Sequence, residues 1–155
     1  MHADALSRLR DQAEIIELIS RYFFSLDSQA FDDAWANSLF TQEAVLTFPV
    51  GSHQGLAGLA DFTVGFMSNW ARTQHHATNH LITFDGDRAN VTWNVLATHV
   101  HPAAEDAPPA AEHFHLGGRF DGEAVRTSVG WRFGRLALKV IWMTGRAAAR
   151  VPRTI

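Results

Sequence analysis

The apolar residues follow a helical period in the first half of the chain and a strand period in the second half. Apolar residues three and four positions apart predict helices at about 5–26, 31–39 and 59–72. Alternation of apolar and polar residues then dominates to the end of the chain. Helices that come first and strands that follow predict an α+β domain in which helices cover one face of a curved, mainly antiparallel sheet. The same order argues against a doubly wound parallel sheet.

The expected strands are rich in β-branched and aromatic residues and are separated by residues typical of turns. Asp85-Gly86-Asp87 marks the clearest turn, and Gly51, Gly55 and Gly58 mark another after the first strand. We attribute Gly117-Gly118 to a bend in the sheet rather than to a phosphate-binding loop. The expected strands are 43–50, 75–84, 88–101, 113–121 and 130–144.

A chain of 155 residues predicts a single domain, 1–155, large enough to bury roughly two thirds of its unfolded surface. We expect its core to span about 6–145 and to be followed by a C-terminal tail at 146–155. A low-complexity stretch rich in Pro and Ala at 102–111 is expected to form a mobile loop between two strands.

Composition excludes several classes of function. The formal charge of −3 offers no basic surface for nucleic acid or anionic membranes. No apolar run approaches the roughly 20 residues that span a bilayer, and the N-terminus lacks a signal pattern, so we expect a cytoplasmic protein. The absence of cysteine excludes disulfides, thiolate catalysis and zinc-thiolate sites.

Three of the nine histidines lie within Thr73–Ile82, at the start of an expected strand. Alternation predicts that His75 shares a face with Ala77, Asn79 and Leu81, while His76 and His80 face the other side in structural roles. On the next strand the same rule predicts that Trp93, Val95, Ala97, His99 and His101 share a face. If these strands pair, His75 and His99 can enter one cavity, although the pattern leaves the register open.

The first expected helix ends in Tyr22-Phe23-Phe24-Ser25-Leu26-Asp27. Asp27 interrupts the helical pattern at the end that faces inward, where it is either a capping residue or a functional carboxylate. Tyr22 lies close to the apolar stripe, so both packing and a place in a pocket stay open for it.

Five segments stand out by their order and spacing: 22–27, 40–45, 73–79, 117–120 and 130–132. Together they resemble the SnoaL-like family of the nuclear transport factor 2-like superfamily. That family includes scytalone dehydratase and hexachlorocyclohexane dehydrochlorinase, and the chain also resembles ketosteroid isomerase-type proteins. The resemblance implies a cone-shaped α+β barrel whose curved sheet encloses a pocket covered by the N-terminal helices. It also implies a homodimer or higher homo-oligomer.

Carried over by residue, the resemblance implies that His75 is the catalytic histidine and Asp27 its partner. Tyr22 matches a variable pocket position, and His99 matches a second histidine. The chain has a single tyrosine and offers Phe48 on its early strand, which argues against dehydration of the scytalone type. The expected substrate-binding residues are Phe48, Phe66, Trp93, Val95, Ala97 and Leu116.

The chemistry of these residue types explains their combination. A neutral imidazole accepts a proton near physiological pH, and a carboxylate on its other nitrogen fixes the tautomer and stabilises the imidazolium. We therefore expect a lyase, isomerase or cyclase that acts without a cofactor on a small apolar, cyclic or polyketide-like substrate. The alternative is a non-catalytic module of the same fold that binds a small ligand or forms dimers.

Two His-x-His pairs, His99-Val100-His101 and His113-Phe114-His115, raise a metal-binding alternative. Such pairs on a strand project both imidazoles to one face. No carboxylate stands at an obvious ligand spacing, and the chain has more opening helices than a metal-binding barrel would. We therefore expect no metal.

Overall fold

The computed structural model describes residues 2–103 and 113–148. Most of the expected loop at 102–111 and the end of the expected tail at 146–155 thus lie outside the described residues. The described part contains helices and strands in the predicted order. These are α1 (His2–Ser28), α2 (Asp33–Leu39), β1 (Phe40–Phe48), β2 (Gly51–Gln54), α3 (Leu59–Met67), β3 (Arg72–Asp85), β4 (Arg88–Val100), β5 (Phe114–Thr127) and β6 (Gly130–Thr144).

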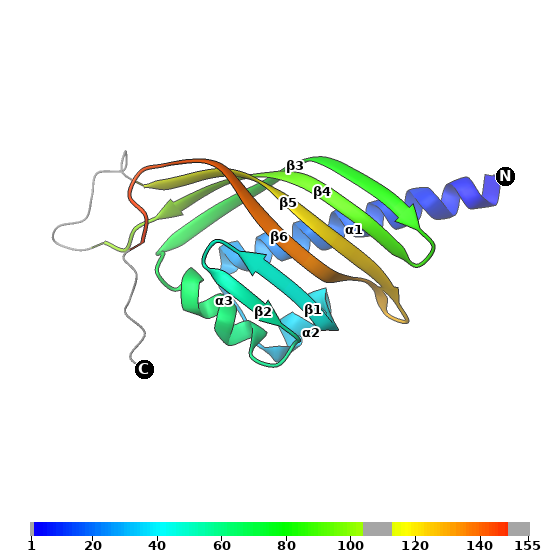
Figure 1. Ribbon diagram of the computed structural model, residues 1–155, viewed down its shortest axis with the longest axis horizontal. Helices are drawn as coiled ribbons and strands as arrows, with labels where there is room; N and C mark the ends of the chain where they lie inside the picture. Colours follow the sequence, from blue (N-terminus) through cyan, green and yellow to red (C-terminus); the bar gives the residue numbers. More distant parts are fainter. Residues whose placement is uncertain (1, 104–112, 149–155) are drawn as a thin grey trace.

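The six strands form one curved sheet in the order β2-β1-β6-β5-β4-β3. Neighbouring strands are antiparallel except for β1 and β6, which are parallel. The long helix α1 runs beneath the sheet and packs mainly on β3, whereas α2 and α3 lie beside β1 and β2 (Figure 1). The predicted α+β class and the curved, mainly antiparallel sheet are confirmed. The sheet stays open, with β2 and β3 at its edges.

Several element boundaries differ from the prediction. The glycine-rich segment after β1 contains a short strand, β2, which forms a hairpin with β1 in which Phe48 pairs with Gly51. Helix α3 ends at Met67 rather than near Arg72, since Arg72 already begins β3. The apolar periodicity overestimated the length of α3, because a single turn of apolar residues after its end fits both a helix and a loop.

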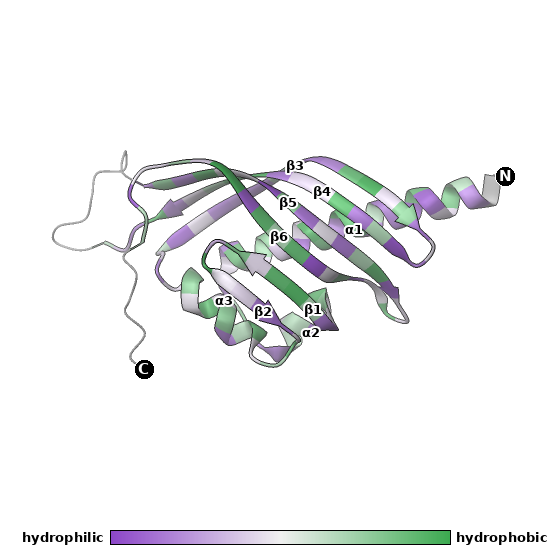
Figure 2. Ribbon diagram, viewed as in Figure 1, coloured by the Kyte–Doolittle hydropathy of each residue, from purple (hydrophilic) through white to green (hydrophobic). Residues whose placement is uncertain are grey.

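An aromatic core fills the space between α1 and the sheet. The rings of Trp93 and Phe120 are stacked with centroids 4.9 Å apart, and Phe23 of α1 packs on both. Figure 2 shows the alternation of hydrophobic and hydrophilic residues along the strands that produces this one-sided burial. Buried aromatic side chains each remove 150–250 Å² from water, so on the order of 4–6 kcal/mol of hydrophobic free energy per ring favours this packing.

A β-bulge in β3 overturns part of the predicted alternation. Thr78 pairs with Asn94 and Leu81 with Thr92, so two residues of β3 oppose one residue of β4. Asn79 adopts a left-handed conformation with φ 57° at this point. Beyond the extra residue, the side chains of β3 point to the opposite faces from those that simple alternation predicts, so Leu81 faces outward and is 71% exposed. The prediction that Asn79 and Leu81 share the face of His75 is therefore wrong.

The same bulge changes the position of His80. Its side chain is partly buried, as are those of Ile82 and Phe84, on the face that also carries His75. His80 therefore does not face the other side of the sheet as predicted, whereas His76 does. A second irregularity falls between Gly117 and Gly118 of β5, in agreement with the bend predicted there.

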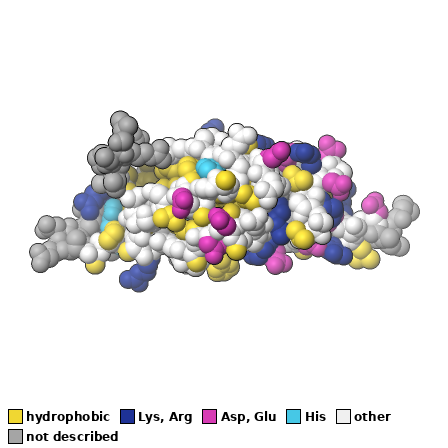
Figure 3. All heavy atoms as spheres, turned by 90° about the horizontal axis from the view of Figure 1, so that it is seen from below, with side chains coloured by type: hydrophobic (Ala, Val, Ile, Leu, Met, Phe, Trp, Pro, Cys, Tyr) yellow, Lys and Arg dark blue, Asp and Glu magenta, His cyan; other side chains and the backbone are white. Residues whose placement is uncertain are grey.

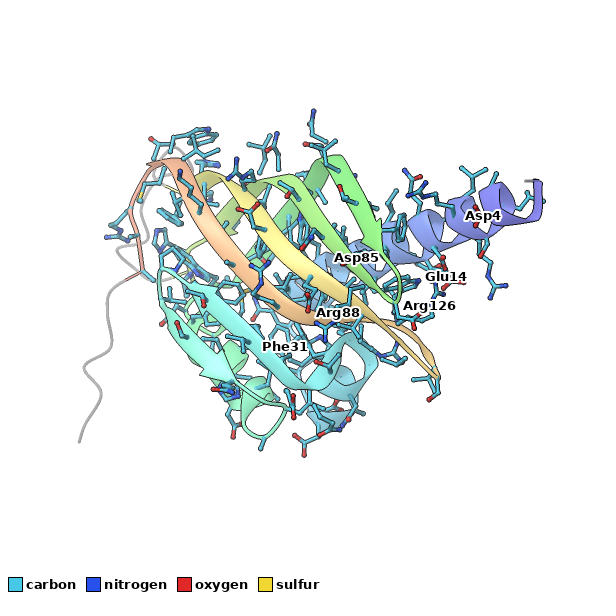
Figure 4. The ribbon with its side chains drawn as sticks, turned by 45° about the vertical axis from the view of Figure 1, so that its right-hand side comes forward. Asp4, Glu14, Phe31, Asp85, Arg88 and Arg126 are labelled. Carbon is cyan, nitrogen blue, oxygen red and sulfur yellow. The ribbon has the colours of Figure 1, made fainter. Side chains whose placement is uncertain are left out.

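A polar cluster ties the N-terminal half of α1 to the sheet. The guanidinium of Arg126 donates two hydrogen bonds to Asp11, of 2.8 and 2.6 Å, and a third of 3.1 Å to Asp87. The indole Nε1 of Trp131 also donates to Asp11, at 3.2 Å. Figure 4 shows Arg126 beside α1, close to the turn between β3 and β4.

None of the described helices is long and apolar enough to cross a membrane.

Candidate active site

Asp27 occupies the last turn of α1, which ends at Ser28. The C-terminal end of a helix carries partial negative charge, so a carboxylate is disfavoured there unless other groups stabilise it. Three donors from β3 supply that stabilisation. The Nδ1 of His75 lies 2.6 Å from Oδ1 of Asp27, and the backbone N–H of His75 donates to Oδ2 at 3.0 Å. The hydroxyl of Thr73 donates to Oδ1 at 2.9 Å.

These contacts act on the charge of Asp27. Burial raises its pKa, but the hydrogen bonds from the ring and backbone of His75 and from Thr73 outweigh burial and hold the pKa below its ordinary value. The carboxylate is thus ionised at neutral pH and accepts a hydrogen bond from Nδ1–H of His75. The neutral tautomer of His75 therefore carries hydrogen on Nδ1 and leaves Nε2 free to accept a proton.

The pair of His75 and Asp27 is largely shielded from solvent. The His75 side chain is 8% exposed and that of Asp27 is 22% exposed. The ring of Phe23 packs against the imidazole with centroids 5.3 Å apart. Exclusion of water strengthens the electrostatic interaction between the two side chains.

The pairing of β3 with β4 brings His99 next to His75. His75 pairs with Ala97, and Thr73 pairs with His99, so the two histidines are diagonal neighbours on the inward face. Their ring centroids lie 5.5 Å apart at an interplanar angle of 81°. The structure thus confirms that one face carries both residues and supplies the register that the sequence left open.

The ring of His99 contacts the rings of Trp70 and Phe114, at centroid distances of 4.9 and 5.4 Å. Burial, assisted by repulsion from His75, lowers the pKa of His99 to about 4. His99 is therefore neutral at physiological pH. Its buried Nδ1 has no hydrogen-bond partner among the described residues.

Tyr22 lies deeper in the aromatic core. It is 2% exposed, and its ring contacts Phe40, Phe120 and Phe133 edge to face. Burial raises the pKa of its hydroxyl, so the phenol stays protonated. This position fits packing directly, and a role in chemistry stays a prediction.

The six predicted substrate-binding residues fall into two groups. Phe48, Phe66 and Leu116 are partly exposed at the edge of the core, where the rings of Phe48 and Phe66 lie 6.1 Å apart. Figure 3 shows hydrophobic side chains gathered at the surface on the side of α2 and α3. The remaining three lie underneath and are 5% exposed or less, namely Trp93, Val95 and Ala97.

The two His-x-His pairs, at 99–101 and 113–115, are not joined into a metal-binding group among the described residues. His101 and His113 have ring centroids 6.3 Å apart, whereas His115 bonds to Thr98. Among residues 2–103 and 113–148, no three His, Cys, Asp or Glu side chains are placed to hold a metal ion.

Sequence reasoning missed Thr73. Alternation alone places it on the face of His75, two positions earlier along the strand. A threonine on a strand is ordinarily explained by β-propensity, so the residue type gave no reason to connect it with Asp27.

The fold and the Asp27–His75 pair describe an α+β domain with a candidate acid–base site. The chain belongs to the SnoaL-like domain family, whose model matches residues 7–137. The predicted resemblance is confirmed. No curated protein sequence matches the chain.

Solved structures share this fold over almost the whole chain. The Kfla4162 protein of Kribbella flavida is 30% identical, with a TM-score of 0.79 and coverage of 88% of this chain and 94% of that one. A provisionally assigned scytalone dehydratase of Novosphingobium aromaticivorans is 24% identical, with a TM-score of 0.76 over 100% of both chains. The hexachlorocyclohexane dehydrochlorinase LinA-type3 of Novosphingobium barchaimii is 21% identical, with a TM-score of 0.75 over 95% of this chain and 97% of that one.

Proposed function

We propose that the protein is a lyase, isomerase or cyclase in which His75 removes a proton from carbon. The observation that carries this proposal is the 2.6 Å contact between Nδ1 of His75 and Oδ1 of Asp27. A carboxylate on one imidazole nitrogen makes the other nitrogen a directed base. Such general bases typically accelerate proton transfer by about 10²- to 10⁴-fold.

In the proposed reaction, Nε2 of His75 takes a proton from a carbon of the substrate. The electron pair of the broken C–H bond forms a double bond, and either a neighbouring leaving group departs or a carbonyl oxygen becomes an enolate. The resulting imidazolium is stabilised by Asp27, and it returns its proton to the leaving group or to another carbon. Elimination, double-bond migration and ring closure all begin with this step.

His99 is proposed to hydrogen-bond an oxygen or leaving group of the substrate while it stays neutral. Its place beside His75 and its unpaired Nδ1 support this role. A buried donor aimed at developing negative charge stabilises the transition state without proton transfer. A chemical role for Tyr22 stays a prediction, and its place among other buried aromatic rings also supports a packing role.

The surroundings favour an uncharged, apolar substrate. The side chains that set the pKa of Asp27 are His75 and Thr73 rather than a lysine or arginine. A carboxylate or phosphate group on a substrate would be repelled by the charge of Asp27, and no Lys or Arg of the described residues is among the main influences on that charge. Partly exposed Phe48, Phe66 and Leu116 offer apolar contacts. The named dehydratase and dehydrochlorinase of this fold also point to elimination from a cyclic compound.

We also propose that the protein forms a homo-oligomer through the outer face of its sheet. Leu81, Leu96 and Trp142 on that face are 71%, 50% and 48% exposed. Burial of such residues between copies would stabilise an oligomer. Light scattering on the purified protein tests this, and a monomer at micromolar concentration would contradict it.

The catalytic proposal can be tested by exchange of protons for deuterium. We expect the protein to accelerate exchange of the acidic carbon protons of β-tetralone in D₂O, measured by NMR. His75→Gln should lose this acceleration, whereas His76→Gln, at an exposed position on the opposite face, should keep it. Exchange by the His75→Gln variant at the rate of the unaltered protein would refute the assignment. Absence of acceleration for β-tetralone and for a panel of other cyclic ketones would favour the ligand-binding alternative.

A further inference from the structure

We propose that Thr73 is a positioning residue that holds the carboxylate of Asp27 in the orientation required by His75. The inference rests on the proposed function, and it adds the side chain of Thr73 to the pair formed by Asp27 and His75. Thr73 does not touch the reacting atoms. It acts through Asp27, to whose Oδ1 its hydroxyl donates a hydrogen bond of 2.9 Å.

The geometry shows how the carboxylate is fixed. Oδ1 accepts from both Thr73 and the ring of His75, while Oδ2 accepts from the backbone N–H of His75. A carboxylate rotates freely about its terminal torsion when one contact holds it. Donors on both oxygens define the plane of the group and direct Oδ1 to Nδ1 of His75.

Thr73 reaches Asp27 because of its place on β3. Residues two positions apart on a strand share a face, so the side chains of Thr73 and His75 both point toward the end of α1. Thr73 is 9% exposed, and water therefore cannot readily replace its hydroxyl. Hydrogen bonds to charged groups are roughly twice as strong as neutral ones, so the loss of this bond should be measurable.

A competing role for the hydroxyl is to satisfy the end of α1. The Oγ1 of Thr73 also lies 3.5 Å from the carbonyl oxygen of Leu26. The hydroxyl carries a single proton, and the shorter distance to a charged acceptor favours Asp27. A purely structural role at Leu26 would change stability without changing the ionisation of Asp27 or the tautomer of His75.

The experiment compares Thr73→Val with Thr73→Ser by NMR of the ligand-free protein. Valine keeps the branched shape and removes the donor, whereas serine keeps the donor. We expect Thr73→Val to raise the pKa of Asp27, measured on its side-chain ¹³C, and to change the ¹⁵N shifts of the His75 ring from a single Nδ1–H tautomer to a mixture. Thr73→Ser should retain both signatures. Thr73→Ala also removes the hydroxyl, so the test can be made with whichever of the Val and Ala variants is folded.

An unchanged pKa of Asp27 and an unchanged His75 tautomer in Thr73→Val or Thr73→Ala would overturn the proposal, whatever the change in stability. In the β-tetralone assay, the variants without the hydroxyl should exchange protons roughly ten-fold more slowly, and Thr73→Ser within about two-fold of the unaltered protein. The NMR signatures need no substrate. The NMR measurements therefore test the role of Thr73 independently of the assignment of His75 as a catalytic base.

Discussion

His75 and Asp27 are joined by a contact of 2.6 Å between Nδ1 and Oδ1, although one lies on β3 and the other at the end of α1. The carboxylate sits at the helix end where the dipole disfavours it, and three hydrogen bonds from β3 compensate. An arrangement that opposes a local rule and is then stabilised by several contacts is typical of functional sites.

Stability should depend on pH through His99. Because burial lowers its folded-state pKa to about 4, the unfolded chain binds a proton that the folded chain does not as the pH falls below about 6.5. The stability contribution is therefore full above about pH 6.5 and is lost progressively down to about pH 4, by roughly 3 kcal/mol. Urea denaturation across this range measures it.

The His99→Gln variant should lose most of this slope, since it has no group that titrates there. The exposed His76 provides a matched control, and His76→Gln should keep the slope. A His99→Gln variant whose stability falls as steeply as that of the unaltered protein would show that other groups, such as His80, cause the effect.

The cluster around Arg126 should stabilise the attachment of α1. Arg126→Met leaves the carboxylate of Asp11, whose side chain is 11% exposed, without its main partner. We expect a loss of about 2 kcal/mol, below the 3–5 of a fully buried pair, because the Arg126 side chain is 38% exposed and partly screened by solvent.

Arg88→Met is the matched control, because Arg88 pairs with Glu123 at the surface. It should cost less than about 1 kcal/mol in the same chemical denaturation experiment. Equal losses of unfolding free energy in the two variants would mean that the burial of Asp11 does not strengthen its ion pair with Arg126.

The bulge at Asn79 should tolerate glycine and resist branched residues. Its φ of 57° is accessible to asparagine and glycine, whereas valine is strained there by roughly 1–2 kcal/mol. The free energy of unfolding of Asn79→Gly, measured by urea denaturation, should therefore lie within about 0.5 kcal/mol of that of the unaltered protein, and that of Asn79→Val should be lower. A stable Asn79→Val would imply that the strand can pair without the bulge.

Much of the fold could be predicted because the two periodicities are long and separate. The bulge could not, since strand alternation assumes one residue opposite one residue, and nothing in Thr78-Asn79-His80 marks an insertion. That single irregularity reversed the expected positions of His80 and Leu81. Strand β2 was missed because it has only four residues and is rich in turn-forming types.

The site was predicted unevenly. Alternation placed His75 and His99 on the inward face, but their distance depends on the register, which becomes visible only in the pairing of β3 with β4. Asp27 was connected to His75 through the family resemblance, not through spacing. Thr73 was overlooked because its role comes from a contact with α1 that no local pattern reveals.

The most direct test of the Asp-His base is the rate of proton exchange catalysed by Asp27→Asn. Asparagine keeps the size of the side chain and removes its charge, so the imidazolium of His75 loses its stabilisation. Circular dichroism would establish that the variant is folded. We expect β-tetralone exchange to fall by about 10²-fold or more. A rate within about two-fold of the unaltered protein would contradict a catalytic role for the pair.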